Sequence, residues 1–280
     1  MTHSIAIIAP GRMGSALAAI LIRSGHRVVT LLDGRSAVSH ARAEAAGMIP
    51  VPRAALGNCD MILSVAPPAE AGALARDLAP LLAAAERKPL FVDMNAVSPG
   101  TVAEIAGIIG GTGCGFVDGC IIGTVPRADY DGPFLYLSGA EAGRASTILG
   151  DCGLWLQVID APVGAASALK MCFAGIMKGI TSLGISMLLA ADRVGAGPVM
   201  ARELERSQPE LWAWFCRQIP ASHVKHGRWV AEMEEISTFL AISGDPEAAA
   251  QFKAVAGGFA RLAEAPATAA PLKTYFGADG

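Results

Sequence analysis

Lys170 and Lys178 are the only charged residues in the apolar stretch 161–191. The stretch predicts one long helix, with Pro162 in its first turn and no later proline to break it. At about 100° per residue, Lys170, Ala174 and Lys178 fall on one side of this helix. A sheltered lysine can hold and deliver a proton, as a general acid/base does. The helix alone leaves another interpretation open, in which Lys170 reaches the surface or pairs with a carboxylate.

A glycine-rich turn, 11–14, follows the first apolar run of the chain, 4–9. In a strand–turn–helix unit, Gly11 lets the backbone approach a pyrophosphate and Gly14 lets the helix pack closely on the strand. The helix N-terminus then faces the anion. Ala9 takes the first glycine position of the G-x-G-x-x-G pattern. The turn predicts a dinucleotide site whose cofactor-binding residues are Gly11, Arg12, Met13 and Gly14.

The end of the second predicted strand, 27–32, bears on which dinucleotide is bound. Asp33 can accept hydrogen bonds from ribose hydroxyls, which favours NAD. Arg35 and Ser36 can hold a 2′-phosphate, which favours NADP. The Arg-Ser pair leads us to predict NADP, with NAD as the alternative.

Short apolar runs alternate with helical stretches from residue 1 to about 161, and no strand pattern returns after Pro162. This alternation predicts a doubly wound parallel sheet of the Rossmann type in residues 1–161. Residues 162–280 are predicted to form an all-helical domain, joined to the first by the long helix. That helix is apolar on nearly all sides, so we expect it to be buried. The tail 267–280 is expected to be frayed.

The composition excludes several classes of function. The chain has 280 residues, of which 52% are hydrophobic and 17% charged, with a net charge of −3. This balance predicts neither a nucleic-acid surface nor an acidic arm. The six cysteines are scattered without histidines at ligand spacing, so we expect no metal site. We see no secretory signal, and the longest uncharged apolar run, 179–191, is too short to cross a membrane. We therefore expect a cytoplasmic protein with a small-molecule substrate.

Four segments of the chain resemble, in order, the signature segments of the β-hydroxyacid dehydrogenases. These are the turn 11–14, Asp93-Met-Asn-Ala-Val-Ser-Pro99, Asp118-Gly-Cys-Ile-Ile-Gly123 and Gly164-Ala-Ala-Ser-Ala-Leu-Lys170. That family includes 3-hydroxyisobutyrate dehydrogenase, 6-phosphogluconate dehydrogenase and the imine reductases. The segment 226–236 is similar to the C-terminal domain of a poorly characterised branch.

The resemblance implies that Lys170 is the general acid/base and that the protein is a homodimer whose helical domains pack together. It implies further cofactor contacts from Val65, Ala66, Pro67 and Asn95. Substrate contacts are expected from Cys120, Ile121, Ile122, Gly123, Ala174 and Lys178. Two of these residues depart from the family pattern. Ile122 replaces a serine and Ala174 replaces an asparagine, which indicates a bulkier or less polar substrate than a simple hydroxy acid.

Three functions are compatible with these residues. The first is an NAD(P)-dependent oxidoreductase that acts on an alcohol or carbonyl compound through Lys170. The second is an imine reductase on the same fold, although the resemblance implies that such enzymes usually lack this lysine. The third is a nucleotide-sensing protein without catalysis, which would not need a sheltered lysine. We favour the first.

Overall fold

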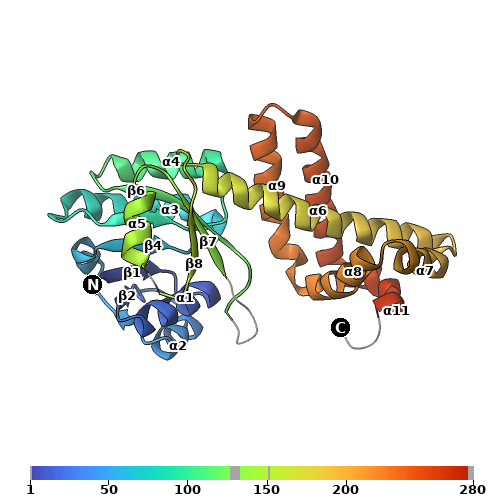
Figure 1. Cartoon of the computed structure of the whole chain (residues 1–280), viewed down its shortest axis with the longest axis horizontal. Coiled ribbons are helices and arrows are strands. Elements are labelled where there is room, and N and C mark those ends of the chain that lie inside the picture. The colour runs from blue at the N-terminus through green and yellow to red at the C-terminus, as the bar shows by residue number, and fades with distance from the viewer. Residues whose placement is uncertain (1, 127–132, 151, 277–280) are drawn as a thin grey trace. The chain divides into compact units, whose positions relative to one another are not determined.

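The computed structural model describes residues 2–126, 133–150 and 152–276. The chain forms two compact units, Met1–Lys170 and Met171–Gly280. The boundary falls inside helix α6, Ala165–Arg193, which the sequence predicts as one long helix (Figure 1).

The first unit is built on an eight-stranded sheet with the order β3-β2-β1-β4-β5-β6-β7-β8. Strands β1 to β6 are parallel neighbours, whereas β7 runs antiparallel to β6, and β8 runs parallel to β7. The predicted parallel sheet is thus confirmed for β1 to β6, and the β6–β7 pair is its one antiparallel exception among the described strands. A parallel neighbour needs a crossover, usually a helix, and the short connection 123–133 follows β6 directly. The strands are β1 Ser4–Ile8, β2 Arg27–Thr30, β3 Ile49–Pro50, β4 Met61–Ser64, β5 Leu90–Asp93, β6 Phe116–Ile122, β7 Phe134–Ser138 and β8 Trp155–Val158.

Helices cover both faces of this sheet, which confirms the doubly wound Rossmann fold (Figure 1). Side chains of α1, α2 and α5 pack on one face, including the fully buried Leu17 and Leu21. Side chains of η1, α3 and α4 pack on the other, including the fully buried Leu78. The central strands β1, β4, β5 and β6 are buried on both faces and are mostly apolar, whereas β3 and β8 at the sheet edges are largely exposed. The bounds are α1 Arg12–Arg23, α2 Ala37–Ala45, η1 Arg53–Asn58, α3 Pro68–Ala84, α4 Pro99–Gly110 and α5 Ala142–Leu149.

The second unit is helical in its described residues, as the sequence predicts. Its core includes Trp212, Phe215, Trp229 and Phe259, so two of its tryptophans serve packing. The expectation of a frayed tail is wrong for the described part, because Leu272 is buried in this core; residues 277–280 lie outside the described residues. The elements are α7 Gly197–Ser207, α8 Pro209–Ser222, η2 His223–Lys225, α9 His226–Ile242, α10 Pro246–Glu264, η3 Pro266–Leu272 and α11 Lys273–Phe276.

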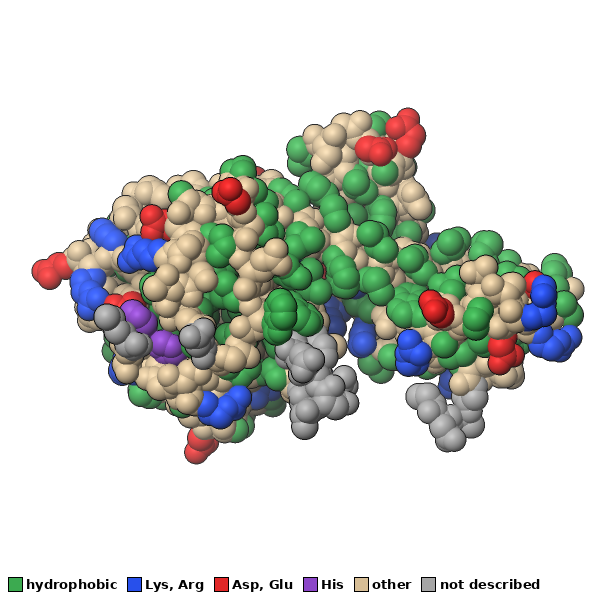
Figure 2. Space-filling model, viewed as in Figure 1, with side chains coloured by type: hydrophobic (Ala, Val, Ile, Leu, Met, Phe, Trp, Pro, Cys, Tyr) green, Lys and Arg blue, Asp and Glu red, His purple; other side chains and the backbone are tan. Residues whose placement is uncertain are grey.

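Helix α6 is buried on one side only, contrary to the expectation of a helix buried all round. Met171, Ile185 and Leu188 face the core of the second unit. Large apolar side chains on its other side are 36–61% exposed, and Figure 2 shows hydrophobic side chains gathered over this helix. We name them the α6 stripe: Phe173, Ile176, Ile180, Leu183 and Met187.

Among the described residues, α6 is the one helix long and apolar enough to cross a membrane, with a mean hydropathy of 1.6 over its most apolar window. Core helices of water-soluble domains pass the same test of length and composition. Here Lys178 lies inside the helix and is mostly buried against Glu232 of α9. That ion pair and the packing of Leu188 are the features of a core helix, since an intramembrane charge is costly.

His226 is expected to make the second unit less stable in acid. Its ring stacks on Phe259 at 5.3 Å, and its Nε2 lies 2.9 Å from Ser222 Oγ. Burial, followed by the charge of His223, lowers the pKa of His226 from 6.5 to about 4. The unfolded chain therefore binds a proton more readily, so this contribution is complete above pH 6.5 and falls as the pH drops toward 4.

Acidification from pH 7.5 to 4.5 is expected to remove about 2 kcal/mol of unfolding free energy through this histidine. Denaturant unfolding at the two pH values measures the loss. The matched variant is His226→Gln, which retains hydrogen bonding to Ser222 but does not titrate. An equal loss in wild type and His226→Gln would assign the acid sensitivity to other groups.

Candidate active site

The glycine turn after β1 is folded tightly upon itself. The Gly11 amide donates to the Ala9 carbonyl at 2.8 Å, and Ala9 has a φ of +67°. This left-handed conformation is strained for alanine and normal for glycine, which explains the glycine usually found there. A Cβ on Gly14 would lie 2.6 Å from the Ala9 carbonyl oxygen, so only glycine fits without displacement. A Cβ on Gly11 would meet nothing within 4 Å, which leaves open space beside the turn.

The helix that begins at this turn presents uncapped backbone amides. The N-cap of α1 is Gly11, which has no side chain to accept a hydrogen bond from them. The N-termini of α2 and α4, by contrast, are capped by the hydroxyls of Ser36 and Ser98. The amides of Arg12 and its neighbours, with the positive end of the helix dipole, form the usual cradle for an anion. This geometry fits the pyrophosphate of a dinucleotide.

The three residues predicted to select the cofactor lie at the end of β2. A turn at Gly34, with φ +71°, follows the exposed Asp33. Arg35 is half-buried, and its Nη1 lies 3.9 Å from Glu70 Oε2 in the first turn of α3. The Ser36 hydroxyl accepts a hydrogen bond from the amide of Ser39 and so caps α2. A cationic side chain and a helix N-terminus thus lie beside the carboxyl end of β1.

Asn95 supports the loop after β4 instead of projecting from the surface. Its Oδ1 accepts from the Ala66 amide at 2.7 Å, and its Nδ2 donates to Ser64 and to Asp93, both at 2.9 Å. Only 2% of Asn95 is exposed. The amide therefore fixes Val65-Ala66-Pro67, the segment predicted to contact the cofactor.

Asp93 is part of the same network. Burial raises its pKa to about 6, although the bonds from Asn95 oppose that shift. The roles of Asp93 and Ser64 in this network were not predicted from the sequence. The signal available was a polar Asp-x-Asn at the end of an apolar strand.

Asp118 anchors the start of α6 to strand β6. Its Oδ2 accepts hydrogen bonds from the amides of Gly164 and Ser167 at 2.9 and 3.1 Å. The hydroxyls of Ser138 and Ser167 also donate to this carboxylate, at 2.9 and 2.7 Å. Asp118 is fully buried and is a helix cap whose bonds set the position of the first turns of α6.

Lys170 lies two turns into α6, and its Nζ donates to the carbonyl oxygen of Ile121 at 2.8 Å. Within the described ranges no carboxylate lies within ion-pair distance of Lys170, so the alternative of a carboxylate partner finds no support there. The ammonium is half-buried at the end of β6, just before Ile122 and Gly123. It is therefore held in place by the backbone and retains its other N–H groups for a second acceptor.

Cys120 lies close enough to Lys170 to feel its charge but cannot act as a thiolate. Burial raises the pKa of Cys120 to about 12, and the opposing effect of Lys170 is smaller. A thiol in this state is not a nucleophile near neutral pH.

Ala174 and Lys178 belong to the second unit. Ala174 is 4% exposed and part of the apolar core. Lys178 forms an ion pair with Glu232, and its Nζ lies 5.3 Å from the ring centre of Trp229. The structure thus gives Lys178 a partner for its charge, and our mechanism does not use it. No group of three metal-binding side chains occurs among the described residues.

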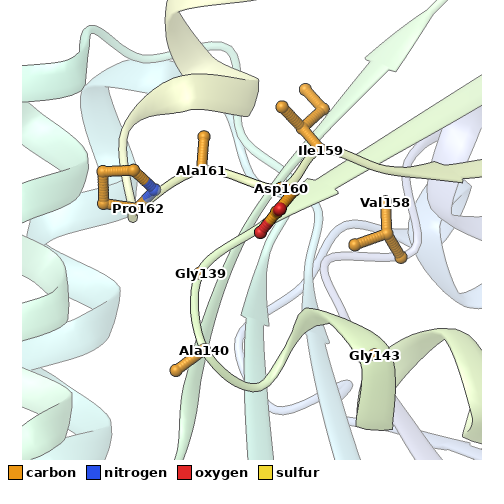
Figure 3. Close-up of a pocket in the computed structure, with 8 residues that line it drawn as sticks. All are labelled: Gly139, Ala140, Gly143, Val158, Ile159, Asp160, Ala161 and Pro162. Carbon is orange, nitrogen blue, oxygen red and sulfur yellow. The ribbon is translucent and has the colours of Figure 1, made fainter.

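An open groove in the first unit is lined by none of the predicted site residues (Figure 3). It is bounded by the turn after β7, the start of α5 and the segment that leads into α6. Asp160 is its one charged side chain, and it offers no cationic group for a phosphate. Its lining residues are Gly139, Ala140, Gly143, Val158, Ile159, Asp160, Ala161 and Pro162.

A parallel doubly wound sheet with an uncapped glycine turn after its first strand defines a dinucleotide-binding class of protein. Residues 4–153 match the NAD binding domain of 6-phosphogluconate dehydrogenase, and the chain therefore belongs to that family, within the β-hydroxyacid dehydrogenase-like superfamily. Residues 191–262 match a domain of unknown function, DUF1932.

Individual relatives agree with this assignment. An uncharacterized 28.5 kDa protein of Methanothermus fervidus is 27% identical over 184 residues, which cover 65% of this chain and 68% of the relative. The structure of MTH1747, a conserved protein of unknown function described as similar to 3-hydroxyacid dehydrogenases, is 27% identical. It has a TM-score of 0.74 and covers 95% of this chain and 99% of its own.

Two more distant structures share the fold. The 3-hydroxyisobutyrate dehydrogenase of Mycobacterium tuberculosis is 18% identical, with a TM-score of 0.69 over 94% of this chain and 99% of its own. An imine reductase from Myxococcus stipitatus, solved with NADP+, is 18% identical with a TM-score of 0.56, over 94% of both chains.

Proposed function

We propose that this protein is an NAD(P)-dependent oxidoreductase that transfers hydride between nicotinamide and an alcohol or carbonyl substrate, with Lys170 as the general acid/base. The observation that carries the proposal is the bond from Lys170 to the Ile121 carbonyl at the carboxyl end of β6. The glycine turn lies at the carboxyl end of β1, which is the same edge of the sheet. Open parallel sheets bind their ligands at this edge.

The bound nicotinamide supplies or accepts the hydride. In the direction of reduction, the Lys170 ammonium donates a proton to the carbonyl oxygen while the carbonyl carbon receives the hydride, which yields the alcohol. In oxidation the neutral amine takes the hydroxyl proton. The Ile121 carbonyl orients the Lys170 side chain, and Asp118 positions the helix that carries it.

The experiment that tests this function is NADPH oxidation by the full chain with aldehydes, ketones, keto acids and cyclic imines. We expect turnover of carbonyl compounds. Turnover of cyclic imines alone would favour an imine reductase, and binding of NADPH without turnover of any class would favour a nucleotide sensor.

We propose NADP as the cofactor, on the basis of Arg35. Replacing Arg35 with alanine is expected to raise the Kd of NADPH about 10- to 100-fold, because a guanidinium–phosphate contact is charge-assisted. The Kd of NADH should change less than about twofold, since NADH lacks the 2′-phosphate. Fluorescence titration of the bound nicotinamide measures both constants.

The matched control is Arg87→Ala. Arg87 is also an arginine in an ion pair, with Asp60 at 2.8 Å, but Asp60 immediately precedes β4, at the opposite edge of the sheet. Equal losses of NADPH affinity in both variants, or equal losses for NADH and NADPH in Arg35→Ala, would contradict the assignment to the 2′-phosphate.

We also propose that the protein is a homodimer that buries the α6 stripe. Its members recur at intervals of three and four residues, as in the seam between two packed helices. Replacing Leu183, which is 60% exposed, with glutamate should shift the mass measured by light scattering from dimer to monomer. The control is Val224→Glu, an exposed apolar residue outside the stripe. A wild-type protein that is monomeric at about 100 μM would contradict the proposal.

A further inference from the structure

Three apolar side chains stand side by side where β6 ends and where β7 and β8 begin. Ile122 pairs with Phe134 of β7, and Phe134 pairs with Trp155 of β8. Directly paired residues project from the same face of a sheet. The rings of Phe134 and Trp155 meet edge to face, with 5.6 Å between their centres. We name Ile122, Phe134 and Trp155 the aromatic row.

The aromatic row lies on the same face of the sheet as the start of α6. Side chains alternate along a strand, so Asp118, Cys120 and Ile122 all project from one face of β6. Asp118 marks that face because it bonds to the first turn of α6. Cys120 lies next along it and feels the charge of Lys170. The opposite face is occupied by Ile121 and its neighbours in the core beneath α1 and α5.

Lys170 and the row are close enough for one small substrate to reach both. The Lys170 Nζ bonds to the carbonyl of Ile121, which directly precedes Ile122, and neighbouring strands of the row lie about 5 Å apart. An aryl ring joined to a carbonyl through one carbon spans a similar length. The carbonyl oxygen would then approach the lysine while the ring lies on Phe134 and Trp155.

The chemistry of the row is that of an apolar binding surface. Trp155 is 61% exposed, while Ile122 and Phe134 are half-buried. An exposed aromatic ring gains the most binding free energy from contact with another ring or with an extended apolar group. The indole N–H of Trp155 is the one hydrogen-bond donor among the three side chains, so the row offers little to a substrate carboxylate.

We propose that the aromatic row is the apolar half of the substrate site and selects carbonyl compounds that carry an aryl or extended apolar group. This inference rests on the proposed function, since Lys170 supplies the proton. It assigns specificity to Phe134 and Trp155, which the sequence motifs do not identify, and gives the apolar Ile122 a role in the same surface.

Phenylacetone and butan-2-one test the proposal because they share a methyl ketone and differ in the aryl ring. Each is titrated by calorimetry into the full chain saturated with NADP+, so that binding is measured without reduction. The wild type should bind phenylacetone about 10-fold more tightly or better. Trp155→Ala and Phe134→Ala should reduce that preference to about twofold or less.

Val158→Ala is the matched control. Val158 is on the same strand and 40% exposed, but it pairs with Leu137 and projects from the opposite face. The preference should survive in this variant. Equal binding of both ketones by the wild type, or a preference that survives in both aromatic variants, would overturn the proposal. A change in oligomeric mass in Trp155→Ala, with the preference retained, would assign the row to a subunit interface.

The same proteins, together with Lys170→Ala, are assayed with NADPH to distinguish the two proposals. A preference for phenylacetone that depends on Trp155, without reduction of either ketone, supports the aromatic row and contradicts the proposed reduction. Reduction of butan-2-one that depends on Lys170, without any preference, supports the function and overturns the row.

Discussion

Replacing Lys170 with alanine is expected to lower kcat for carbonyl reduction about 10²- to 10⁴-fold, the usual contribution of a general acid. The Kd of NADPH should change less than about twofold, because the predicted cofactor residues follow β1, β2, β4 and β5, whereas Lys170 bonds to β6. Stopped-flow oxidation of NADPH and fluorescence titration measure the two constants. The bond to the Ile121 carbonyl is lost in this variant without leaving an unpaired buried charge.

Lys170→Arg is the control that separates a role of Lys170 in proton transfer from a role of its positive charge alone. Arginine retains a cation and donors for Ile121 but does not release its proton near neutral pH. We expect kcat to remain low in Lys170→Arg. Recovery of wild-type kcat by arginine would mean that Lys170 acts through its charge alone, and an unchanged kcat in Lys170→Ala would remove it from the mechanism.

Alanine substitutions at the two glycines of the turn should have different effects on cofactor affinity and stability. Gly11→Ala is expected to raise the Kd of NADPH about 10-fold or more at an unchanged Tm, because its methyl group enters only the space beside the turn. Gly14→Ala is expected to lose about 1–3 kcal/mol of unfolding free energy as well, because its Cβ would overlap the Ala9 carbonyl.

Thermal unfolding without cofactor, followed by NADPH titration, measures both effects. The backbone of Gly11 has a φ of −72°, so alanine adopts it without strain. Unchanged affinity of Gly11→Ala for NADPH would show that the pyrophosphate does not lie at this turn. A lowered Tm would contradict the open space beside Gly11.

The first unit follows closely from its sequence because each strand and helix carries a local signal. Residues 5–8 are apolar, and the glycine turn and the helix after it match a known pattern of strand, turn and helix. The reversal of β7 has no such signal. It depends on the connection 123–133, whose length permits a direct return but does not require one.

The second unit was predicted less completely. The residues of α7 were not identified as a helix, and the burial of Leu272 depends on contacts with helices far away in the sequence. The exposed stripe of α6 was missed because an apolar helix carries no sign of which of its sides remains uncovered.

The reactive and binding residues of the candidate site were easier to predict than the contacts that they make. The position of Lys170 in an apolar helix singled it out, but its partner is a backbone carbonyl, and any residue supplies one. Asn95 was predicted to reach the cofactor, whereas its amide is occupied by Ala66 and Asp93. The pairing of Phe134 with Trp155 follows from strand register, which the sequence does not specify.

Transfer of deuterium from NADPH labelled at C4 of its nicotinamide tests the central claim most directly. The full chain is incubated with labelled NADPH and a panel of aryl and alkyl ketones, and the product is analysed by mass spectrometry. We predict one deuterium on the carbinol carbon of an alcohol, formed by wild type and nearly absent with Lys170→Ala. Saturation with NADPH and no deuterium in any alcohol would contradict the proposed carbonyl reduction.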